Sequence, residues 1–344
     1  MSDVGKIERI TQNRVVELFR DELGYKYLGN WEEREGNSNI EEGLLTDCLT
    51  EAGYSPEQIS RALDKLRRES ANPSRTLYAN NQAVYGLLRY GVPISGGPGQ
   101  KDQTVWLINW AEPEKNHFAI AEEVTLNGDH ERRPDIALYV NGLALGVLEL
   151  KRSTVGIGEG IRQAISCQDK MFHEWFYPTV QFVMAGNDSE GLRYGTIGTP
   201  EKYFLKWKED EDDNTRFKLD KYLLKLCEKR RLLEIIRDFV VFDAGVKKLP
   251  RHHQYFGIKL AQEHAKQKQS GIIWHTQGSG KSIVMVLLSQ WILENNPNAR
   301  VCIITDRDEL DKQIKDVFSA AGHKIYRTSS GRDLMAQLEA SENR

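Results

Sequence analysis

Apolar positions along the first 70 residues recur at the three-to-four-residue spacing of amphipathic helices. The third such stretch begins with Ser55, Pro56 and Glu57, which fit an N-cap, a first helical residue and a first-turn acid. The pattern therefore predicts a helical N-terminal part, with helices over 11–23, 40–53 and 55–69.

The pattern changes after a loop predicted at 91–103, where six of thirteen residues are Gly or Pro. From Thr104 onward, short apolar runs alternate with turn residues, which indicates a sheet rather than helices. The expected strands cover 104–110, 117–126, 135–140 and 143–150. A helix at about 158–175 and a strand at 178–186 are expected to follow.

The boundary between two structural units is expected near Gly245–Pro250. The acidic run Glu209–Asp213 is an alternative boundary, but a helical stretch at 221–240 follows it, and a solvated loop explains the acids. After Pro250, strand-like runs alternate with helical ones, which predicts a parallel sheet. These runs are 271–274, 282–296, 300–305 and 307–321. The expected fold is α/β, with units at 1–245 and 246–344.

Composition narrows the class of protein. Of the 344 residues, 40% are apolar and 28% charged, which suits ordinary packed cores. The net charge of −3 argues against nucleic acid held by a global positive field, but leaves local basic grooves possible. No apolar run is long enough to cross a membrane, and the N-terminus does not have the pattern of a secretory signal. The four cysteines form no C-x-x-C pair, so a reducing cytoplasm is expected rather than zinc or disulfides.

A glycine-rich loop, HTQGSGKS at 275–282, lies between an expected strand and a long apolar helix. Such a loop binds phosphate because its glycines let the backbone wrap closely and the helix N-terminus offers unpaired N–H groups. We expect Lys281 to reach the β- and γ-phosphates of ATP and the Ser282 hydroxyl to hold Mg²⁺. His275 stands where the general phosphate-loop pattern has Gly. The other expected nucleotide-binding residues of the loop are Thr276, Gln277, Gly278, Ser279 and Gly280.

Two observations extend the nucleotide hypothesis. Gln254 lies 27 residues before Lys281, where a glutamine reads the adenine edge in many helicases, although an exposed glutamine is the alternative. Asp306 follows Lys281 by only 25 residues, too close for the acidic box of a helicase motor. No later segment resembles that box, so we expect an incomplete motor that hydrolyses ATP poorly by itself.

The run PDIALYVNGLALGVLELK at 134–151 predicts a hairpin that turns at Asn141-Gly142. A simple two-residue turn would pair Asp135 with Leu148, whereas a three-residue loop or a bulge would pair Asp135 with Glu149. We expect one of the latter. Two converging carboxylates form a site for Mg²⁺, with Lys151 orienting water or stabilising charge. The alternative is a Glu–Lys pair on an edge strand, with Asp135 as a turn residue.

Both motifs, in this order, resemble the N-terminal part of the restriction (R, motor-nuclease) subunit of type I restriction-modification enzymes. Further segments carry the resemblance along nearly the whole chain: LGYKYLGNW, NIEEGLL, RLLEIIRDFVVFD, RHHQYFGIKLA and ITDRDELDKQI. The resemblance implies a PD-(D/E)xK, RecB-like nuclease domain followed by the start of a RecA-like superfamily 2 motor.

The resemblance also implies roles for individual residues. Asp135 and Glu149 would be metal ligands, Lys151 the catalytic lysine, and Gln163 the glutamine of a Q-x-x-x-Y motif. Cys167 stands where that motif has Tyr, and an exposed helix residue is the alternative for Gln163. The implied partners are double-stranded DNA and separate modification and specificity subunits, with ATP-driven translocation coupled to cleavage. A non-catalytic docking module is the competing hypothesis for the N-terminal unit.

Basic residues cluster near the expected boundary, at 225–231, 247–248 and 251–253. Solvated helix faces explain such clusters, and a groove contacting the DNA backbone is the alternative.

Overall fold

The computed structural model describes residues 3–340 except for 96–100, 129–131, 170–172, 210–214, 306–307, 321 and 323. The chain divides between Arg237 and Asp238 into two compact parts, which we call the N-terminal unit and the C-terminal unit. This division lies a few residues before the boundary expected at Gly245–Pro250.

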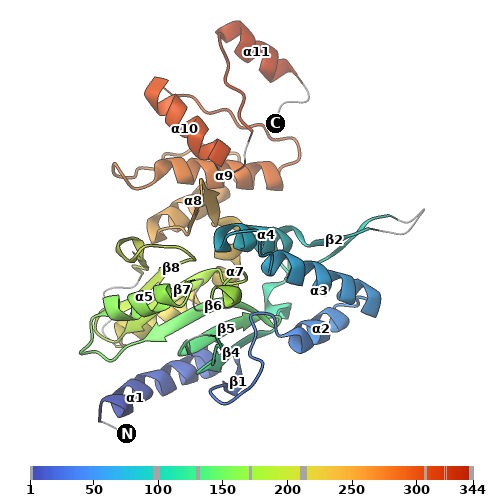
Figure 1. Ribbon diagram of the computed structural model, residues 1–344. Helices are drawn as coiled ribbons and strands as arrows, with labels where there is room; N and C mark the ends of the chain where they lie inside the picture. The colour runs from blue at the N-terminus through green and yellow to red at the C-terminus, as the bar shows by residue number, and fades with distance from the viewer. Residues whose placement is uncertain are drawn as a thin grey trace. The chain divides into compact units, whose positions relative to one another are not determined.

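A mixed seven-stranded sheet forms the centre of the N-terminal unit, as far as its described residues extend (Figure 1). The β1–β4 and β6–β7 pairs are parallel and the others antiparallel. Strands β4 to β7 are buried along their whole length, as expected for strands covered on both faces. The spatial order is β1 (Lys26–Asn30), β4 (Phe118–Glu122), β5 (Ile136–Val140), β6 (Leu143–Leu150), β7 (Phe182–Asn187), β8 (Gly191–Gly195) and β9 (Leu205–Lys206).

Helices lie close against both faces of this sheet. A Cβ built on Gly160, in α5 (Ile157–Ser166), would lie 3.4 Å from the Cβ of Ala185 on β7. A Cβ on the next strand residue, Gly186, would lie 2.4 Å from Leu219 of α6 (Lys218–Leu226). Successive strand residues face opposite sides. Helices α5 and α6 therefore cover opposite faces.

The predicted helical N-terminal part is confirmed in outline. Helices α1 (Asp3–Glu17), α2 (Glu42–Glu51) and α3 (Pro56–Ser70) correspond to the three predicted helices. The N-cap at Ser55 is confirmed, because its hydroxyl accepts from the N–H of Gln58 in a reciprocal capping box. The prediction of helices alone was wrong at β1, a short, half-exposed edge strand whose sequence has no clear alternation. Helix α4 (Leu77–Tyr90) was not predicted.

The predicted loop at 91–103 was wrong at its ends, where β2 (Val92–Ile94) pairs with β3 (Gln103–Val105). Its centre, residues 96–100, lies outside the described residues. The predicted strand at 104–110 is therefore limited to the end of β3.

Two further predicted elements were too long. Helix α5 ends at Ser166 rather than near 175, and β7 begins at Phe182 rather than 178. The helical stretch at 221–240 is two helices, α6 and α7 (Lys229–Asp238). They separate because the Glu228 carboxylate accepts hydrogen bonds from the N–H groups of Arg230 and Arg231, and so starts a new helix. The acidic run Glu209–Asp213 lies almost wholly outside the described residues.

The C-terminal unit contains the hairpin β10 (Val241–Asp243) and β11 (Val246–Lys248). Helices α9 and α10 occupy the two segments predicted as helical. Its described helices are α8 (His252–Lys266), α9 (Lys281–Asn295), α10 (Asp308–Ala320) and α11 (Gly331–Glu339).

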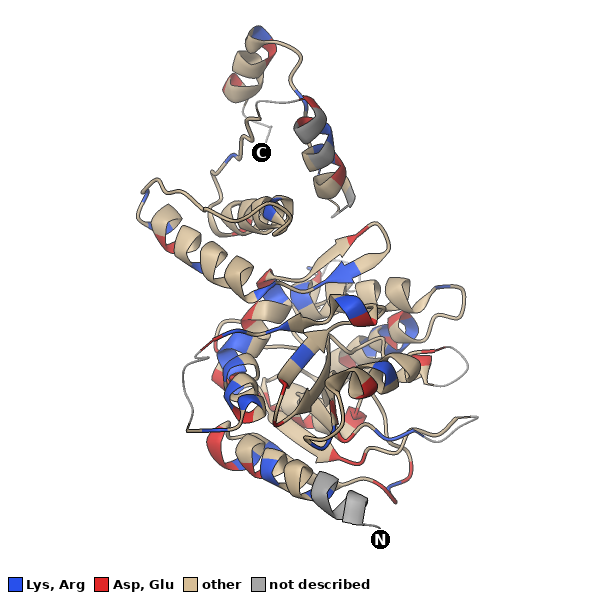
Figure 2. Ribbon diagram, turned by 90° about the vertical axis from the view of Figure 1, so that its left-hand side faces the viewer, with Lys and Arg blue, Asp and Glu red and all other residues tan. Residues whose placement is uncertain are grey.

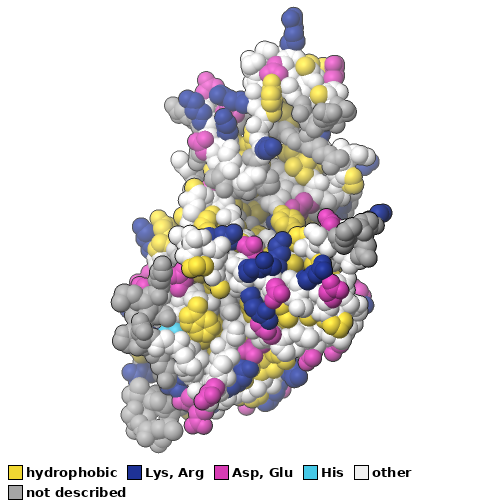
Figure 3. Space-filling model, turned by 45° about the vertical axis from the view of Figure 1, so that its right-hand side comes forward, with side chains coloured by type: hydrophobic (Ala, Val, Ile, Leu, Met, Phe, Trp, Pro, Cys, Tyr) yellow, Lys and Arg dark blue, Asp and Glu magenta, His cyan; other side chains and the backbone are white. Residues whose placement is uncertain are grey.

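The predicted parallel sheet of this unit was wrong for the described residues, since 271–274 and 300–305 are not assigned to strands. A strand needs a hydrogen-bonded neighbour and cover for its apolar side chains. Ile272, Trp274 and Ile304 are instead 92%, 90% and 87% exposed. Figure 3 shows apolar side chains at the surface of this unit. No helix in the described part of the chain has the length and apolar character needed to span a membrane.

Candidate functional site

The hairpin β5–β6 sets the register on which the candidate metal site depends. Asn141 and Gly142 form a two-residue turn with φ of 52° and 81°. The turn is tightly fixed, because a Cβ on Gly142 would lie 2.7 Å from the carbonyl oxygen of Glu41. The Asn141 side chain donates to the carbonyl of Leu107 and accepts from the N–H of His117.

A bulge then shifts the pairing by one residue. Tyr139 pairs with Ala144, but the next pair is Leu138 with Gly146, so Leu145 is the extra residue. Beyond the bulge Ile136 pairs with Leu148, and the same register places Asp135 opposite Glu149. The predicted bulge is confirmed, and the competing three-residue loop was wrong.

Glu149 is a buried carboxylate whose charge is only partly compensated by nearby cations. Its side chain is 1% exposed, and its Oε2 accepts no hydrogen bond from the described residues. Burial raises the pKa of Glu149 well above its ordinary value; the charge of Asp135 raises it further and that of Lys151 lowers it. Burying an uncompensated carboxylate costs free energy, which a bound cation would offset.

Asp135 and Lys151 lie beside this carboxylate. Asp135 is half-buried, and its Oδ2 accepts a hydrogen bond from the backbone N–H of Leu150. The backbone N–H of Lys151 donates to the carbonyl of Gly186 at 2.9 Å, which continues the ladder between β6 and β7. A Cβ on Gly160 would lie 3.2 Å from Cγ of Lys151 and 3.8 Å from Cβ of Glu149, so α5 covers both side chains.

The donor set fits Mg²⁺, which proteins bind through one or two carboxylates while water and phosphate oxygens complete the octahedron. Within the part of the chain that the structure describes, no three His, Cys, Asp or Glu side chains are placed to hold a metal by themselves.

Gln163 lies on α5 three residues after Gly160, on the side of the helix that faces the strands, and is half-buried. Cys167 follows at the end of the helix and is buried. Burial, together with the charge of Glu149, raises the pKa of the Cys167 thiol to about 12. The same thiol forms a hydrogen bond with the buried hydroxyl of Tyr177, so an aromatic residue from a later segment reaches this region.

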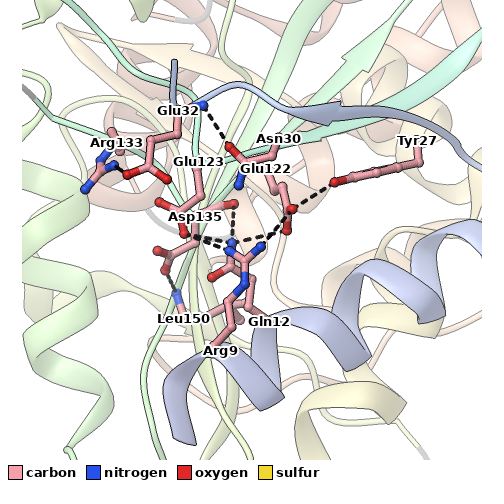
Figure 4. Close-up of polar contacts among 10 residues, drawn as sticks. All are labelled: Arg9, Gln12, Tyr27, Asn30, Glu32, Glu122, Glu123, Arg133, Asp135 and Leu150. Carbon is pink, nitrogen blue, oxygen red and sulfur yellow. Dashed lines mark hydrogen bonds and ion pairs between the residues drawn. The ribbon is translucent and has the colours of Figure 1, made fainter. Parts of the chain in front are cut away.

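A second group of charged residues lies next to Asp135, and the sequence analysis missed it (Figure 4). Glu122 ends β4 and Glu123 follows it; Arg9 and Gln12 of α1 contact both carboxylates. Two adjacent acids at the end of the apolar run FAIA were the available signal.

The glycine-rich loop leads into α9. Gly278 and Gly280 have φ of 75° and 84°, which a residue with a Cβ adopts at a cost. The Lys281 ammonium donates to the carbonyls of His275 and Thr276, at 3.2 and 3.0 Å. Ser282 is half-buried in the first turn of α9, and Thr276 and Gln277 are exposed.

Gln254 contacts the loop itself. Its Nε2 donates to the carbonyls of Ser279 and Gly280 at 2.9 and 3.3 Å, and its Oε1 accepts from the N–H of Arg251. The side chain is 3% exposed. Gln254 thus fastens the start of α8 to the loop, and adenine recognition stays a prediction.

The basic segment 225–231 carries compensating contacts in the N-terminal unit. Arg230 pairs with Glu114 and Arg231 with Glu209, and the Lys229 ammonium donates to the carbonyl of Gly24. Figure 2 shows basic residues mixed with acidic ones over this unit. The segment is therefore more neutral than its sequence indicates.

Fold and sites together define a mixed α/β protein with a candidate metal site in one unit and a candidate phosphate loop in the other. The family model described as the N terminus of the type I restriction enzyme R protein matches residues 7–202. The chain belongs to this family. A second family model, the SWI2/SNF2 ATPase, matches residues 253–344.

Curated relatives are similar along almost the whole chain. The type I restriction enzyme HindI endonuclease subunit of Haemophilus influenzae is 27% identical over 99% of this chain. The putative MjaVIIIP and MjaIXP endonuclease subunits of Methanocaldococcus jannaschii are 28% and 24% identical over 98% and 96%. The chain spans 35%, 35% and 36% of these three proteins.

Proposed function

We propose that this chain provides the nuclease site and the nucleotide-binding loop of a motor-nuclease subunit that cleaves double-stranded DNA with Mg²⁺ and translocates it with ATP. The observation that carries the nuclease proposal is the buried Glu149 opposite Asp135, with an oxygen that has no hydrogen-bond partner among the described residues and with Lys151 directly after the same strand. Family membership supports it. In this proposal the N-terminal unit is a PD-(D/E)xK nuclease and the C-terminal unit the beginning of a RecA-like motor.

Each residue at the candidate site has a distinct task. Asp135 and Glu149 would hold Mg²⁺, which when bound polarises the scissile phosphate and acidifies a coordinated water. The Leu150 N–H fixes the Asp135 carboxylate, and α5 shields Glu149 from bulk water. The Lys151 ammonium stabilises the negative charge that develops on the phosphate when water attacks phosphorus and the phosphodiester P–O bond breaks. Gln163 helps to orient substrate from α5.

The loop at 275–282 would bind the phosphates of ATP. The Lys281 ammonium already donates to two backbone carbonyls. Phosphate oxygens can replace these carbonyls as acceptors, so the ammonium would keep its hydrogen bonds when ATP binds. Ser282 would hold the Mg²⁺ that accompanies ATP. Adenine recognition by Gln254 requires this side chain to leave Ser279 and Gly280 or to use its remaining acceptor capacity.

The proposed partners are double-stranded DNA and the modification and specificity subunits of a type I complex. The relatives' names support an assembly of this kind. Sequence recognition would belong to another subunit, because the basic segment at 225–231 is held in ion pairs and backbone contacts carry no sequence information.

The test uses the full-length subunit, assembled with modification and specificity subunits, on circular DNA with Mg²⁺, with and without ATP. Asp135→Asn and Lys151→Ala should each lower cleavage by about 100-fold or more and leave ATP hydrolysis intact. Lys281→Ala should abolish both ATP hydrolysis and cleavage of circular DNA. Glu159→Gln, which removes an exposed acid of α5, is the matched control.

Normal cleavage in both Asp135→Asn and Lys151→Ala would contradict the nuclease proposal and favour a docking role for the N-terminal unit. ATP-driven translocation that survives Lys281→Ala would contradict the motor proposal separately.

A further inference from the structure

Glu122 and Glu123 are adjacent acids whose side chains lie on the same side of the chain. In a regular strand, neighbouring side chains point to opposite faces. Glu123 has a φ of 51°, a left-handed conformation that breaks this alternation. Arg9 contacts Glu122 at 3.1 Å and Glu123 at 3.4 Å, and Gln12 reaches the same two carboxylates at 3.4 and 3.0 Å (Figure 4).

Glu123 is also tied directly to Asp135. Its backbone N–H donates to the carbonyl of Asp135 at 3.0 Å. The Gln12 amide that binds the Glu123 carboxylate also donates to the same carbonyl, at 3.4 Å. Glu122 differs, because its carboxylate accepts a hydrogen bond from the Tyr27 hydroxyl at 2.8 Å on the β1 side.

The orphan oxygen of Glu149 is an independent sign that this acidic region takes a cation. Glu149 is 1% exposed and its Oε2 has no partner among the described residues. The negative charges of Asp135 and Glu123 raise the pKa of Glu149, whereas the positive charges of Lys151 and Arg132 lower it. Arg9 is partly exposed and shared between two carboxylates, so one of their two charges remains uncompensated.

We propose that Glu123 is a positioning residue of the candidate metal site, whose charge, held beside Asp135 by Gln12 and Arg9, strengthens Mg²⁺ binding without direct ligation. The absence of a three-carboxylate metal cage among the described side chains is consistent with action at longer range. This inference rests on the proposed nuclease function and adds a third acid, from the residue after β4, to the pair on the β5–β6 hairpin.

The test measures Mg²⁺ dependence in Glu123→Gln, with Glu122→Gln as the matched control that shares the Arg9 and Gln12 contacts. In the full-length complex, Glu123→Gln should raise the Mg²⁺ concentration for half-maximal cleavage about five- to tenfold, as expected when one charge near a divalent cation is lost. Its rate at saturating Mg²⁺ should stay within about twofold of wild type. Glu122→Gln and the charge-conserving Glu123→Asp should resemble wild type.

A direct binding measurement accompanies the kinetics. Titration of the nucleotide-free subunit with Mn²⁺, followed by electron paramagnetic resonance, should show weaker binding in Glu123→Gln by a similar factor. The Mn²⁺ binding that remains in Asp135→Asn measures binding outside the candidate site and serves as the background.

Three results would overturn the inference: an unchanged Mg²⁺ dependence in Glu123→Gln, an equal shift in Glu122→Gln, or a Glu123→Asp variant that behaves like Glu123→Gln. An equal shift in Glu122→Gln would show that the contacts holding α1 matter rather than the charge of Glu123. A Glu123→Asp variant that behaves like Glu123→Gln would show that side-chain length matters rather than charge. Failure of the nuclease proposal is distinguishable, because it would appear as normal cleavage in Asp135→Asn.

Discussion

Gly160 offers a test of whether the cover provided by α5 positions Lys151, the proposed catalytic lysine. The helix lies so close to β6 that a methyl group at this position would meet Cγ of Lys151 at 3.2 Å, Cβ of Ala185 at 3.4 Å and Cβ of Glu149 at 3.8 Å. The first contact is shorter than the optimum of about 3.5–4.0 Å between carbon atoms. Gly160→Ala should therefore displace the Lys151 side chain by a few tenths of an ångström.

The stability effect of Gly160→Ala should be small because two terms oppose each other. Replacing Gly by Ala inside a helix stabilises by about 0.8–1.0 kcal/mol. Overpacking a close contact costs about 1 kcal/mol at the mild end of its range, and Lys151 has a flexible stem that can yield. The free energy of unfolding should change by less than about 1 kcal/mol, which corresponds to no more than about 4 °C in melting temperature. Cleavage should nevertheless fall about tenfold, since catalysis tolerates little misplacement of a charged group.

Gly158→Ala is the matched control for this prediction. It adds the same methyl group to the same helix, but the methyl meets only the mobile ends of Glu201 and Arg162, which are partly exposed. The assay compares thermal melting and cleavage of circular DNA by the full-length complex for both variants. Wild-type cleavage in Gly160→Ala, or an equal loss in Gly158→Ala, would refute the idea that the close contact with α5 positions Lys151.

Three further predictions concern the N-terminal unit and one cysteine from each unit. Gly142→Ala should destabilise the chain by about 3 kcal/mol, measured by thermal melting. The alanine would have to adopt the left-handed φ of this turn, and its methyl group would lie 2.7 Å from the Glu41 carbonyl oxygen. An unchanged melting temperature would contradict the turn geometry. A thiol reagent should modify exposed Cys302 well before buried Cys167, whose pKa is raised to about 12, and peptide mass spectrometry would detect the reverse order. Glu149→Gln should raise the melting temperature at pH 8 without divalent ions and remove stabilisation by Mg²⁺, because burial raises the pKa of Glu149 and its ionised form opposes folding above the ordinary carboxyl pKa. Melting curves with and without Mg²⁺ that match wild type would contradict it.

Local patterns made the hairpin and its register predictable. Asn141-Gly142 indicates a two-residue turn, and such a turn alone would put Glu149 out of register with Asp135. The requirement that two acids converge therefore predicted either a three-residue loop or a bulge, and Leu145 provides the bulge. The N-cap at Ser55 was predictable for the same reason, since capping depends on residues three positions apart.

Long-range contacts account for what the sequence did not reveal. Gln12 and Glu123 are separated by 111 positions, and nothing in either local pattern indicates that they meet. The exposed segments around Ile272 and Ile304 are a case in which the local pattern indicated too much. Their composition is typical of strands, but a strand does not form where no neighbouring strand pairs with it. Gln254 was recognised as significant, but its contacts with Ser279 and Gly280 depend on how α8 packs against the loop.

The cost of placing Glu149 in β6 is the physical reason to assign this position a chemical task. Its sequence neighbours Leu148 and Leu150 are buried, and an apolar side chain at position 149 would avoid both the desolvation of a carboxylate and repulsion from Asp135. Lys151 and Arg132 offset only part of this cost, because Asp135 and Glu123 repel the same carboxylate. Packing alone therefore does not explain the acid, whereas the proposed divalent cation, shared with Asp135, would satisfy the orphan oxygen and turn an unfavourable buried charge into a ligand.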